Sequence, residues 1–120
     1  VLAILKKAGM RLAVASNKYQ EATQKIVEHY FPNTFDVVFG EREGVPRKPD
    51  PQVVYDISAL LPDEKTMYIG DSMVDIETAR NAGVPIIACS WGFADRGVLL
   101  AARPDYLIDR PEEIYKCVNL

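Results

Sequence analysis

Three groups of polar residues have the types and positions needed to bind an anion beside a hard metal ion. Ser16-Asn17-Lys18 follows a short apolar run, and Lys48 comes just before a Pro-Asp-Pro sequence. Asp71 and Asp75 follow a third apolar run, four residues apart. A serine hydroxyl with neighbouring N–H groups can bind an oxyanion, and a lysine ammonium can neutralise a phosphate. Two carboxylates offer the oxygen ligands that Mg²⁺ takes.

Each of these residues also has an ordinary structural explanation. A serine or aspartate after a strand commonly caps the next helix, and an aspartate in a first turn complements the helix dipole. Asp71 and Asp75 are spaced to share one face of a helix start, where two like charges repel unless a cation compensates them. The combination of residues therefore favours a phosphate-and-metal site more than any member does alone.

Alternating apolar runs and amphipathic segments must position these residues. Strands are expected at 11–16, 35–39, 66–70, 84–90 and 105–108, and helices at 2–8, 20–31, 50–61, 74–82, 98–102 and 111–118. This alternation favours parallel strands with helical crossovers, and the apolar strands favour a sheet covered on both faces. Ligands bind at the carboxyl ends of such strands, where the polar groups lie. We predict one α/β domain over 1–120, a Rossmann-like three-layer α/β/α parallel sheet.

Composition narrows the functional classes. The 120 residues are 48% hydrophobic and 26% charged, which is typical of a soluble globular domain. The net charge of −3 without a basic run argues against nucleic-acid binding, and no apolar stretch reaches the ~20 residues of a membrane helix. Cys89 and Cys117 have no metal-site spacing, so buried reduced thiols and a cytoplasmic location are expected.

The order of these motifs resembles the haloacid dehalogenase superfamily, in particular its phosphoglycolate-phosphatase-like branch. Ser16-Asn17-Lys18 is similar to the second motif of that family, and Lys48-Pro49-Asp50-Pro51 to the third. Gly70-Asp71-Ser72-Met73-Val74-Asp75 is similar to the fourth. Ser90-Trp91-Gly92-Phe93 and the stretch from Pro104 to Asp109 also resemble this branch, so the resemblance covers essentially the whole chain.

The resemblance implies a Mg²⁺-dependent phosphatase that hydrolyses a small, phosphoglycolate-like phosphomonoester through an aspartyl-phosphate intermediate. It implies that Ser16 and the N–H of Asn17 bind the transferred phosphoryl group, and that Lys48 balances charge on the nucleophile and the phosphate. It also implies that Asp71 ligates Mg²⁺ and that Asp75 supports the metal shell or Lys48. Ser16, Lys48, Asp71 and Asp75 are thus the expected catalytic residues, and the two aspartates the metal residues.

One motif of the family is missing from these residues. No Asp-x-Asp occurs in the chain, although the family's first motif supplies the nucleophile on a central strand between those of Ser16 and Asp71. We therefore expect a preceding segment, carrying this strand and a cap domain, in the parent protein. The 120 residues alone are expected to be an incomplete core without turnover, and an unpaired strand edge would allow self-association.

Other interpretations stay open. A phosphosugar mutase or a pyrophosphatase could use the same scaffold. A truncated, non-catalytic fold could bind phosphate or act as an interaction module, although such a chain has no physical reason to keep two close carboxylates. A signalling receiver domain is also α/β, but there the acidic cluster comes first and the lysine last, whereas here Ser16 and Lys48 precede Asp71.

Overall fold

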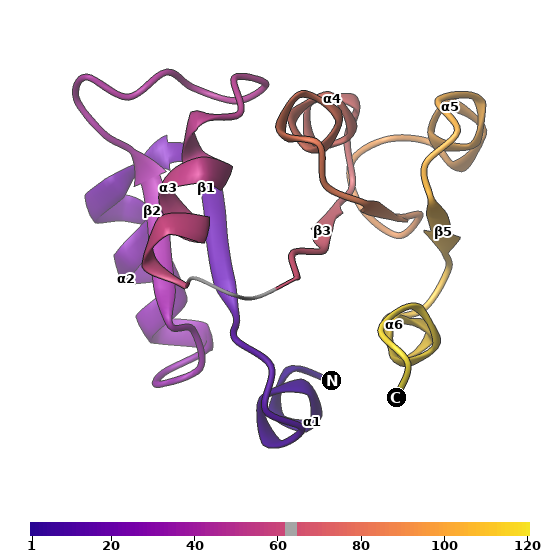
Figure 1. Ribbon diagram of the computed structural model, residues 1–120, viewed down its shortest axis with the longest axis horizontal. Helices are drawn as coiled ribbons and strands as arrows, with labels where there is room; N and C mark the ends of the chain where they lie inside the picture. The colour runs from indigo at the N-terminus through magenta and orange to yellow at the C-terminus, as the bar shows by residue number, and fades with distance from the viewer. Residues whose placement is uncertain (62–64) are drawn as a thin grey trace. The chain divides into compact units, whose positions relative to one another are not determined.

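The computed structural model describes residues 1–61 and 65–120. The chain divides into two compact units, Val1–Glu64 and Lys65–Leu120, called here the N-terminal and the C-terminal unit. In each unit, parallel strands form a sheet with helices on both of its faces (Figure 1). The predicted α/β class with parallel strands is therefore confirmed, and the prediction of a single domain over 1–120 stays a prediction.

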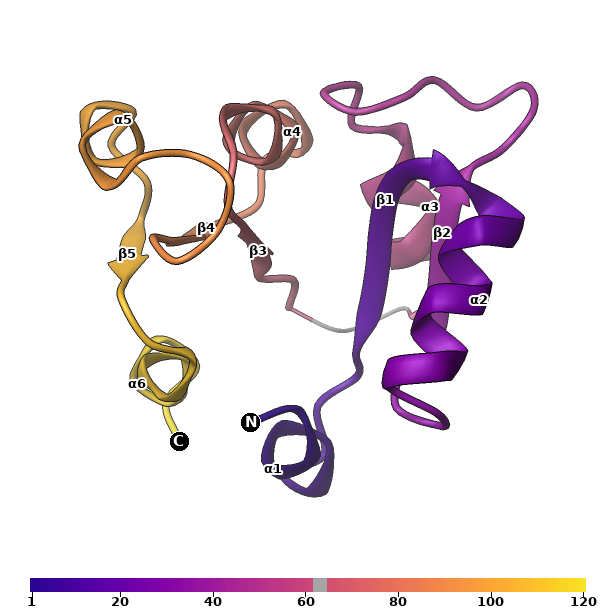
Figure 2. The same cartoon turned by 180° about the vertical axis from the view of Figure 1, so that it is seen from behind.

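The N-terminal unit is built on two parallel strands. Figures 1 and 2 view it from opposite sides and show α3 on one face of the sheet and α2 on the other. Its elements are α1 (Leu2–Lys7), β1 (Ala13–Tyr19), α2 (Gln20–Tyr30), β2 (Val37–Glu41) and α3 (Gln52–Leu60).

The predicted helix boundaries in this unit follow from local chemistry. The first helix ends before Gly9, which adopts a φ of 91° that suits glycine. α3 begins at Gln52 with Pro51 as its N-cap, later than the predicted start at Asp50, and the Asp50 carboxylate accepts a 2.9 Å hydrogen bond from the N–H of Gln52. From α3, Val53 and Val54 are buried against the sheet.

β1 does not end at Ser16, as the sequence predicted, but continues to Tyr19. Ala15 pairs with Phe39 and Tyr19 pairs with Glu41, so residues 16–18 all lie opposite the single residue Gly40. This irregularity keeps the polar residues in an extended backbone while freeing them from the regular ladder. Ser16 and Asn17 therefore lie in a bulge of β1 and not in a loop after it.

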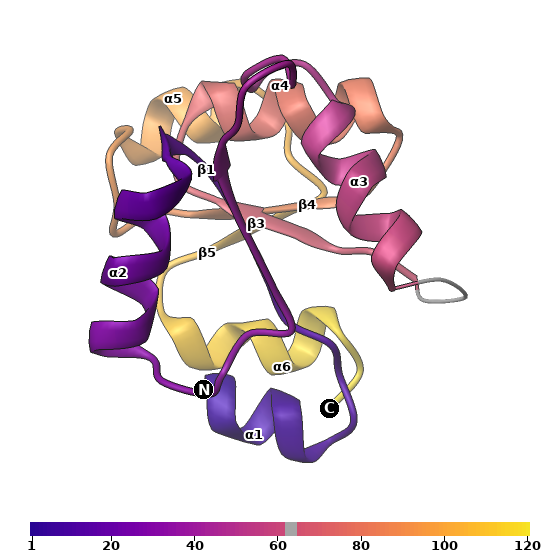
Figure 3. The ribbon, with the colours of Figure 1, turned by 90° about the vertical axis from the view of Figure 1, so that its left-hand side faces the viewer.

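The C-terminal unit has three parallel strands in the order β3-β4-β5. In Figures 1 and 3, α4 and α5 lie on one side of this sheet and α6 lies on the other. Its elements are β3 (Tyr68–Gly70), α4 (Met73–Ala82), β4 (Ile86–Cys89), α5 (Arg96–Ala101), β5 (Tyr106–Ile108), the 3₁₀ turn η1 (Pro111–Glu113) and α6 (Ile114–Cys117).

The core of this unit surrounds β4, of which every residue is buried. Ile76 from α4 and Leu99 from α5 pack there with no exposed surface. α4 ends at Gly83 in the left-handed conformation, as predicted. β4 begins at Ile86 and not at 84, because Pro85 has no N–H to donate to a ladder.

Among the described residues, no helix is long and apolar enough to cross a membrane. α2, the longest, has 11 residues, about half of what a bilayer requires.

Candidate functional site

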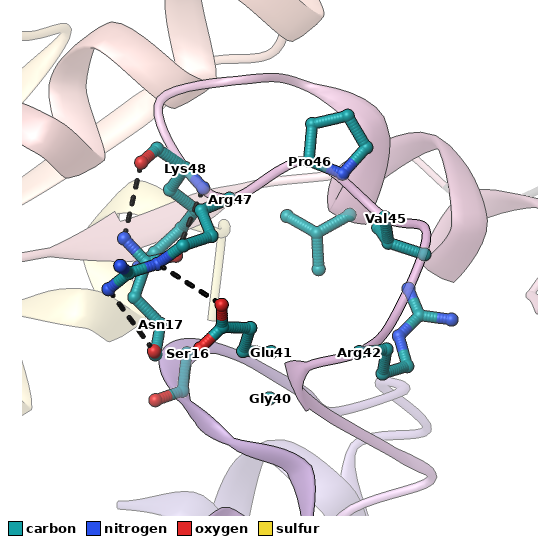
Figure 4. Close-up of a pocket in the computed structure, with 10 residues that line it drawn as sticks. Ser16, Asn17, Gly40, Glu41, Arg42, Val45, Pro46, Arg47 and Lys48 are labelled. Atoms are coloured by element: carbon teal, nitrogen blue, oxygen red, sulfur yellow. Dashed lines mark hydrogen bonds and ion pairs between the residues drawn. The ribbon is translucent and has the colours of Figure 1, made fainter.

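The N-terminal unit brings together three of the predicted residues, Ser16, Asn17 and Lys48. All three line one depression where the bulge of β1 meets the loop that follows β2 (Figure 4). The side-chain amide of Asn17 donates a 3.2 Å hydrogen bond to the carbonyl of Lys48 and accepts a 3.0 Å bond from its N–H. The Lys48 ammonium donates a 3.1 Å hydrogen bond to the carbonyl of Ala15. A residue 31 positions away therefore fixes the lysine beside the bulge.

The side chain of Ser16 lines the depression and makes one hydrogen bond with the backbone. Its oxygen accepts a 3.1 Å hydrogen bond from the N–H of Lys18, which holds the side chain in a short turn. Because the oxygen acts as an acceptor there, its hydrogen can still be donated to a ligand. Ser16 can thus provide one donor while Lys48 provides positive charge.

Gly40 and the side chain of Gln20 hold the bulge in shape. A Cβ on Gly40 would collide with the carbonyl of Lys18 and with the Thr23 hydroxyl, so the two segments approach more closely than any other residue would permit. The side chain of Gln20 accepts a 2.7 Å bond from the Gly40 N–H and donates a 2.8 Å bond to Val38. These contacts were not anticipated from the sequence.

The depression carries more positive than negative charge. Arg42, Arg47 and Lys48 line it with one acid, Glu41. Arg42 is committed elsewhere, because its guanidinium lies 2.8 Å from Asp56 and 3.8 Å from the centre of the Phe39 ring. Hydrogen bonds from Gln52 and Arg42 lower the pKa of Asp56, which keeps this carboxylate ionised. Of the other two cations, Arg47 lies 3.9 Å from Glu41, and Lys48 donates to the carbonyl of Ala15.

The C-terminal unit holds the two predicted metal residues in different environments. Ser72, not Asp71, caps α4, and its hydroxyl accepts a 3.3 Å hydrogen bond from the N–H of Asp75. Asp71 therefore precedes the helix, and the expectation that both carboxylates share a helical face is wrong. Asp71 lies outside the helix because Ser72, the N-cap, has an extended backbone, so helical geometry begins only at Met73.

Asp75 is buried, and its carboxylate accepts hydrogen bonds from three neighbouring groups. Its side chain is 7% exposed and accepts hydrogen bonds from the Tyr68 hydroxyl at 2.9 Å, the Asp71 N–H at 3.1 Å and the Ser72 hydroxyl at 2.9 Å. Burial, and then the charge of Asp75, raise the pKa of Tyr68, so the phenol stays a donor. Asp75 thus fixes the conformation of the turn that presents Asp71.

Asp71 keeps one oxygen available. Its Oδ2 accepts a 3.1 Å hydrogen bond from the Phe93 N–H, and its carbonyl accepts a 3.0 Å bond from the Ala94 N–H. No hydrogen bond reaches its Oδ1 from the residues that the structure describes. A Cβ on Gly92 would collide with this carboxylate, and one on Gly70 would collide with Asp75. Because these two residues lack a side chain, a carboxylate can lie directly against their backbone.

These donors fit a hard divalent cation of the kind that the sequence suggested. Within residues 1–61 and 65–120, no group of three or more His, Cys, Asp or Glu side chains forms a preformed cage. Mg²⁺ commonly uses one or two carboxylates and completes its shell with waters and phosphate oxygens. The open Oδ1 of Asp71 meets that requirement, with Asp75 as its support.

The sequence predicted both groups of residues but not what holds them. The structure brings Ser16, Asn17 and Lys48 together in one unit, and Asp71 and Asp75 in the other. Convergence of the two groups on one site stays a prediction. The sequence assigned no role to Gly40, Gly70, Gly92, Gln20 or Tyr68, although Gly70 and Gly92 belong to its motifs and each glycine lies at or just beyond a strand end.

Comparison with known proteins agrees with the motifs. A family model described as haloacid dehalogenase-like hydrolase matches residues 1–89. A phosphoglycolate phosphatase of Aquifex aeolicus is 31% identical over 98% of this chain and 55% of its own length. An inferred pyrophosphatase PpaX of Caldanaerobacter subterraneus is 33% identical over 99% of this chain and 56% of its own.

A solved structure gives the same result for the fold. The crystal structure of an inferred phosphoglycolate phosphatase from Lactobacillus delbrueckii is 39% identical and superposes with a TM-score of 0.92, over 98% of this chain and 50% of that one. The chain thus spans about half the length of the relatives that it matches. Because the family model covers well over half of these residues, the chain belongs to the haloacid dehalogenase-like hydrolase family.

Proposed function

We propose that the full-length protein is a Mg²⁺-dependent phosphatase that hydrolyses a small phosphomonoester through an aspartyl-phosphate intermediate. Two relatives, named as a phosphoglycolate phosphatase and a pyrophosphatase, support hydrolysis of a phosphoryl group. The nucleophile lies outside these 120 residues, which contain no Asp-x-Asp. Phosphoglycolate is the first substrate to test.

The observation that carries this proposal is the clamp of Asn17 on Lys48. It holds Lys48 at the bulge of β1, in the depression that Ser16 also lines. Ligands bind near the carboxyl ends of strands in parallel sheets, which supports a binding role for this depression. Phosphoryl transfer depends mainly on positioning and on neutralising negative charge, so a fixed cation beside a hydroxyl donor is the expected arrangement.

Each residue then has a distinct role in the proposed reaction. Ser16 and the N–H of Asn17 bind the phosphoryl oxygens, and Lys48 balances their charge and that of the nucleophile. Asp71 is the metal ligand of this chain, since its Oδ1 is open, and Asp75 positions Asp71 through the bond to its N–H. When bound, Mg²⁺ supplies electrostatic stabilisation of the phosphate oxygens.

A phosphate-release assay on the full-length protein tests the proposal. Phosphoglycolate, pyrophosphate and a hexose phosphate are compared with and without Mg²⁺, beside the Lys48→Ala and Ser16→Ala variants. We expect Mg²⁺-dependent release, nearly complete loss in Lys48→Ala, and a milder loss in Ser16→Ala because backbone donors remain. Full activity of Lys48→Ala, or release from none of the substrates, would reject the proposal.

The same assay separates the alternatives. Preference for pyrophosphate over phosphoglycolate would assign the pyrophosphatase activity, and interconversion of hexose phosphates would assign a mutase. The 120-residue chain is assayed in parallel, and we expect no turnover from it. A full-length protein that binds phosphate without turnover would support the non-catalytic interpretation.

A further inference from the structure

Arg47 is the cation of the depression with the longest contacts to its partners. Its Nε lies 3.9 Å from Oε1 of Glu41, and its Nη2 donates a hydrogen bond of 3.5 Å to the carbonyl of Asn17 (Figure 4). Both distances are at the outer limit for such contacts, and the side chain is 59% exposed. The guanidinium therefore retains most of its five donors for a ligand.

The neighbouring cations differ from Arg47 in this respect. Arg42 is paired at 2.8 Å with Asp56 and stacked on Phe39, so its charge is already compensated. Lys48 is held by the Asn17 side chain and directs its ammonium to the Ala15 carbonyl. Within the described residues, Arg47 thus differs from Arg42 in having only a long contact to a carboxylate, and it differs from Lys48 in having no side chain that clamps its backbone.

The position of Arg47 is nevertheless fixed relative to the phosphate-binding candidates. It directly precedes Lys48, and Asn17 contacts both residues, through its side chain to Lys48 and through its carbonyl to Arg47. Arg47, Ser16 and Lys48 all line the same depression. One asparagine therefore sets the spacing between the cation proposed for the phosphoryl group and a second cation.

We propose that Arg47 is a specificity residue that binds a second anionic group of the substrate, a carboxylate or another phosphate, next to the phosphoryl group held by Ser16 and Lys48. This inference rests on the proposed function. A guanidinium presents parallel N–H donors that match carboxylate and phosphate oxygens. An exposed ion pair such as that with Glu41 contributes little, so a ligand can replace it at small cost.

Two ligands that differ in one carboxylate test the inference without turnover. Phosphonoacetate and methylphosphonate share a phosphonate that a phosphatase does not hydrolyse, and only the first carries a carboxylate. Their dissociation constants are measured by calorimetry in Mg²⁺ with the full-length protein and its Arg47→Gln and Arg47→Lys variants. The control is Arg11→Gln, because Arg11 is similarly exposed, at 56%, and similarly paired, 3.8 Å from Asp36, but does not line the depression.

We expect the unsubstituted protein and Arg11→Gln to prefer phosphonoacetate. In Arg47→Gln the ratio of the two dissociation constants should fall about tenfold, as removal of one charge-assisted contact predicts. Arg47→Lys should keep part of the preference. Equal affinity for the two ligands before substitution, or a preference that survives Arg47→Gln, would overturn the inference. An equal loss for both ligands in Arg47→Gln would overturn it too, because that result indicates a structural role.

The two proposals fail in distinguishable ways. A protein that prefers phosphonoacetate through Arg47 but releases no phosphate from any substrate contradicts the phosphatase and supports the binding role of Arg47. A protein that releases phosphate but shows no Arg47-dependent preference contradicts the inference about Arg47 and leaves the phosphatase standing.

Discussion

Asn17 and Lys48 are joined by two hydrogen bonds between the side-chain amide of the first and the backbone of the second, at 3.2 Å and 3.0 Å. The asparagine side chain thus pairs with both the N–H and the carbonyl of Lys48, as the backbone of a neighbouring strand would. The Lys48 ammonium in turn donates to the carbonyl of Ala15, directly before the bulge of β1. The resemblance had implied only that the N–H of Asn17 binds phosphate.

Substitution of Asn17 should therefore reduce activity through Lys48. In Asn17→Ala both hydrogen bonds are lost, and we expect kcat to fall about 10- to 100-fold as the lysine loses its fixed position. Asn17→Asp keeps the acceptor for the Lys48 N–H and should be intermediate. Steady-state kinetics of the full-length protein measures the effect, and thermal unfolding controls for misfolding. Unchanged kcat in Asn17→Ala would show that the clamp does not position the lysine.

Asp71 and Asp75 should respond differently to the same isosteric change. Asp71→Asn removes charge but keeps an oxygen for the Phe93 N–H, so we expect little loss of stability and a fall in turnover of about 100-fold or more. Asp75→Asn introduces an amide donor among three donors at a buried site, which should cost about 1–3 kcal/mol of stability.

Urea unfolding and the Mg²⁺ dependence of turnover distinguish these two variants. Asp71→Asn should require more Mg²⁺ at an unchanged unfolding midpoint, and Asp75→Asn should shift the midpoint. The reverse pattern, with Asp71→Asn unstable and Asp75→Asn changed only in its metal dependence, would show that the two roles are assigned the wrong way round.

Gly92 should be intolerant of a side chain, because a Cβ there collides with the Asp71 carboxylate. We expect Gly92→Ala to displace this carboxylate or the loop that holds it, and thus to lower turnover at least tenfold. Gly97 provides the matched control, since it lies within α5 and a Cβ there meets nothing within 4 Å. Gly97→Ala should be neutral or stabilising by about 0.5–1 kcal/mol. Equal activity of both variants would contradict the tight approach at Gly92.

Cys89 should react slowly with alkylating agents in the folded protein. Burial, and then the charges of Asp71 and Asp75, raise the pKa of its thiol from 9.0 to about 11, and the thiolate is the reactive form. Since the folded pKa is the higher one, the proton on this thiol stabilises the fold below pH 9, and the contribution is lost as the pH rises towards 11.

Iodoacetamide labelling at pH 8, followed by mass spectrometry of the peptide that contains Cys89, measures this reactivity. We expect labelling of the folded protein to be about 100-fold slower than of the urea-unfolded protein, in line with the change in thiolate fraction. Labelling of the folded protein should accelerate as the pH approaches 11. Equal rates at pH 8 would mean that the thiol is exposed and not shifted.

The sequence by itself determined the features that depend on local pattern. The alternation of apolar runs with amphipathic segments predicted parallel strands and helices, Gly83 predicted the end of α4, and Asp50 lies two residues before the start of α3 at Gln52. The order of Ser16, Lys48 and Asp71 predicted the family. These predictions succeeded because backbone conformation and the burial of apolar residues are encoded within a few positions of each residue.

The tertiary structure decided how the polar side chains are held. The bulge at residues 16–18, the clamp of Asn17 on Lys48 and the contact of Asp71 with Phe93 each depend on segments 20 or more positions apart. Spacing along the chain does not encode such contacts, because they require the strands to be packed first. The three hydrogen bonds to Asp75 come from nearby residues, but they too form only once Tyr68 and the turn before α4 are in place.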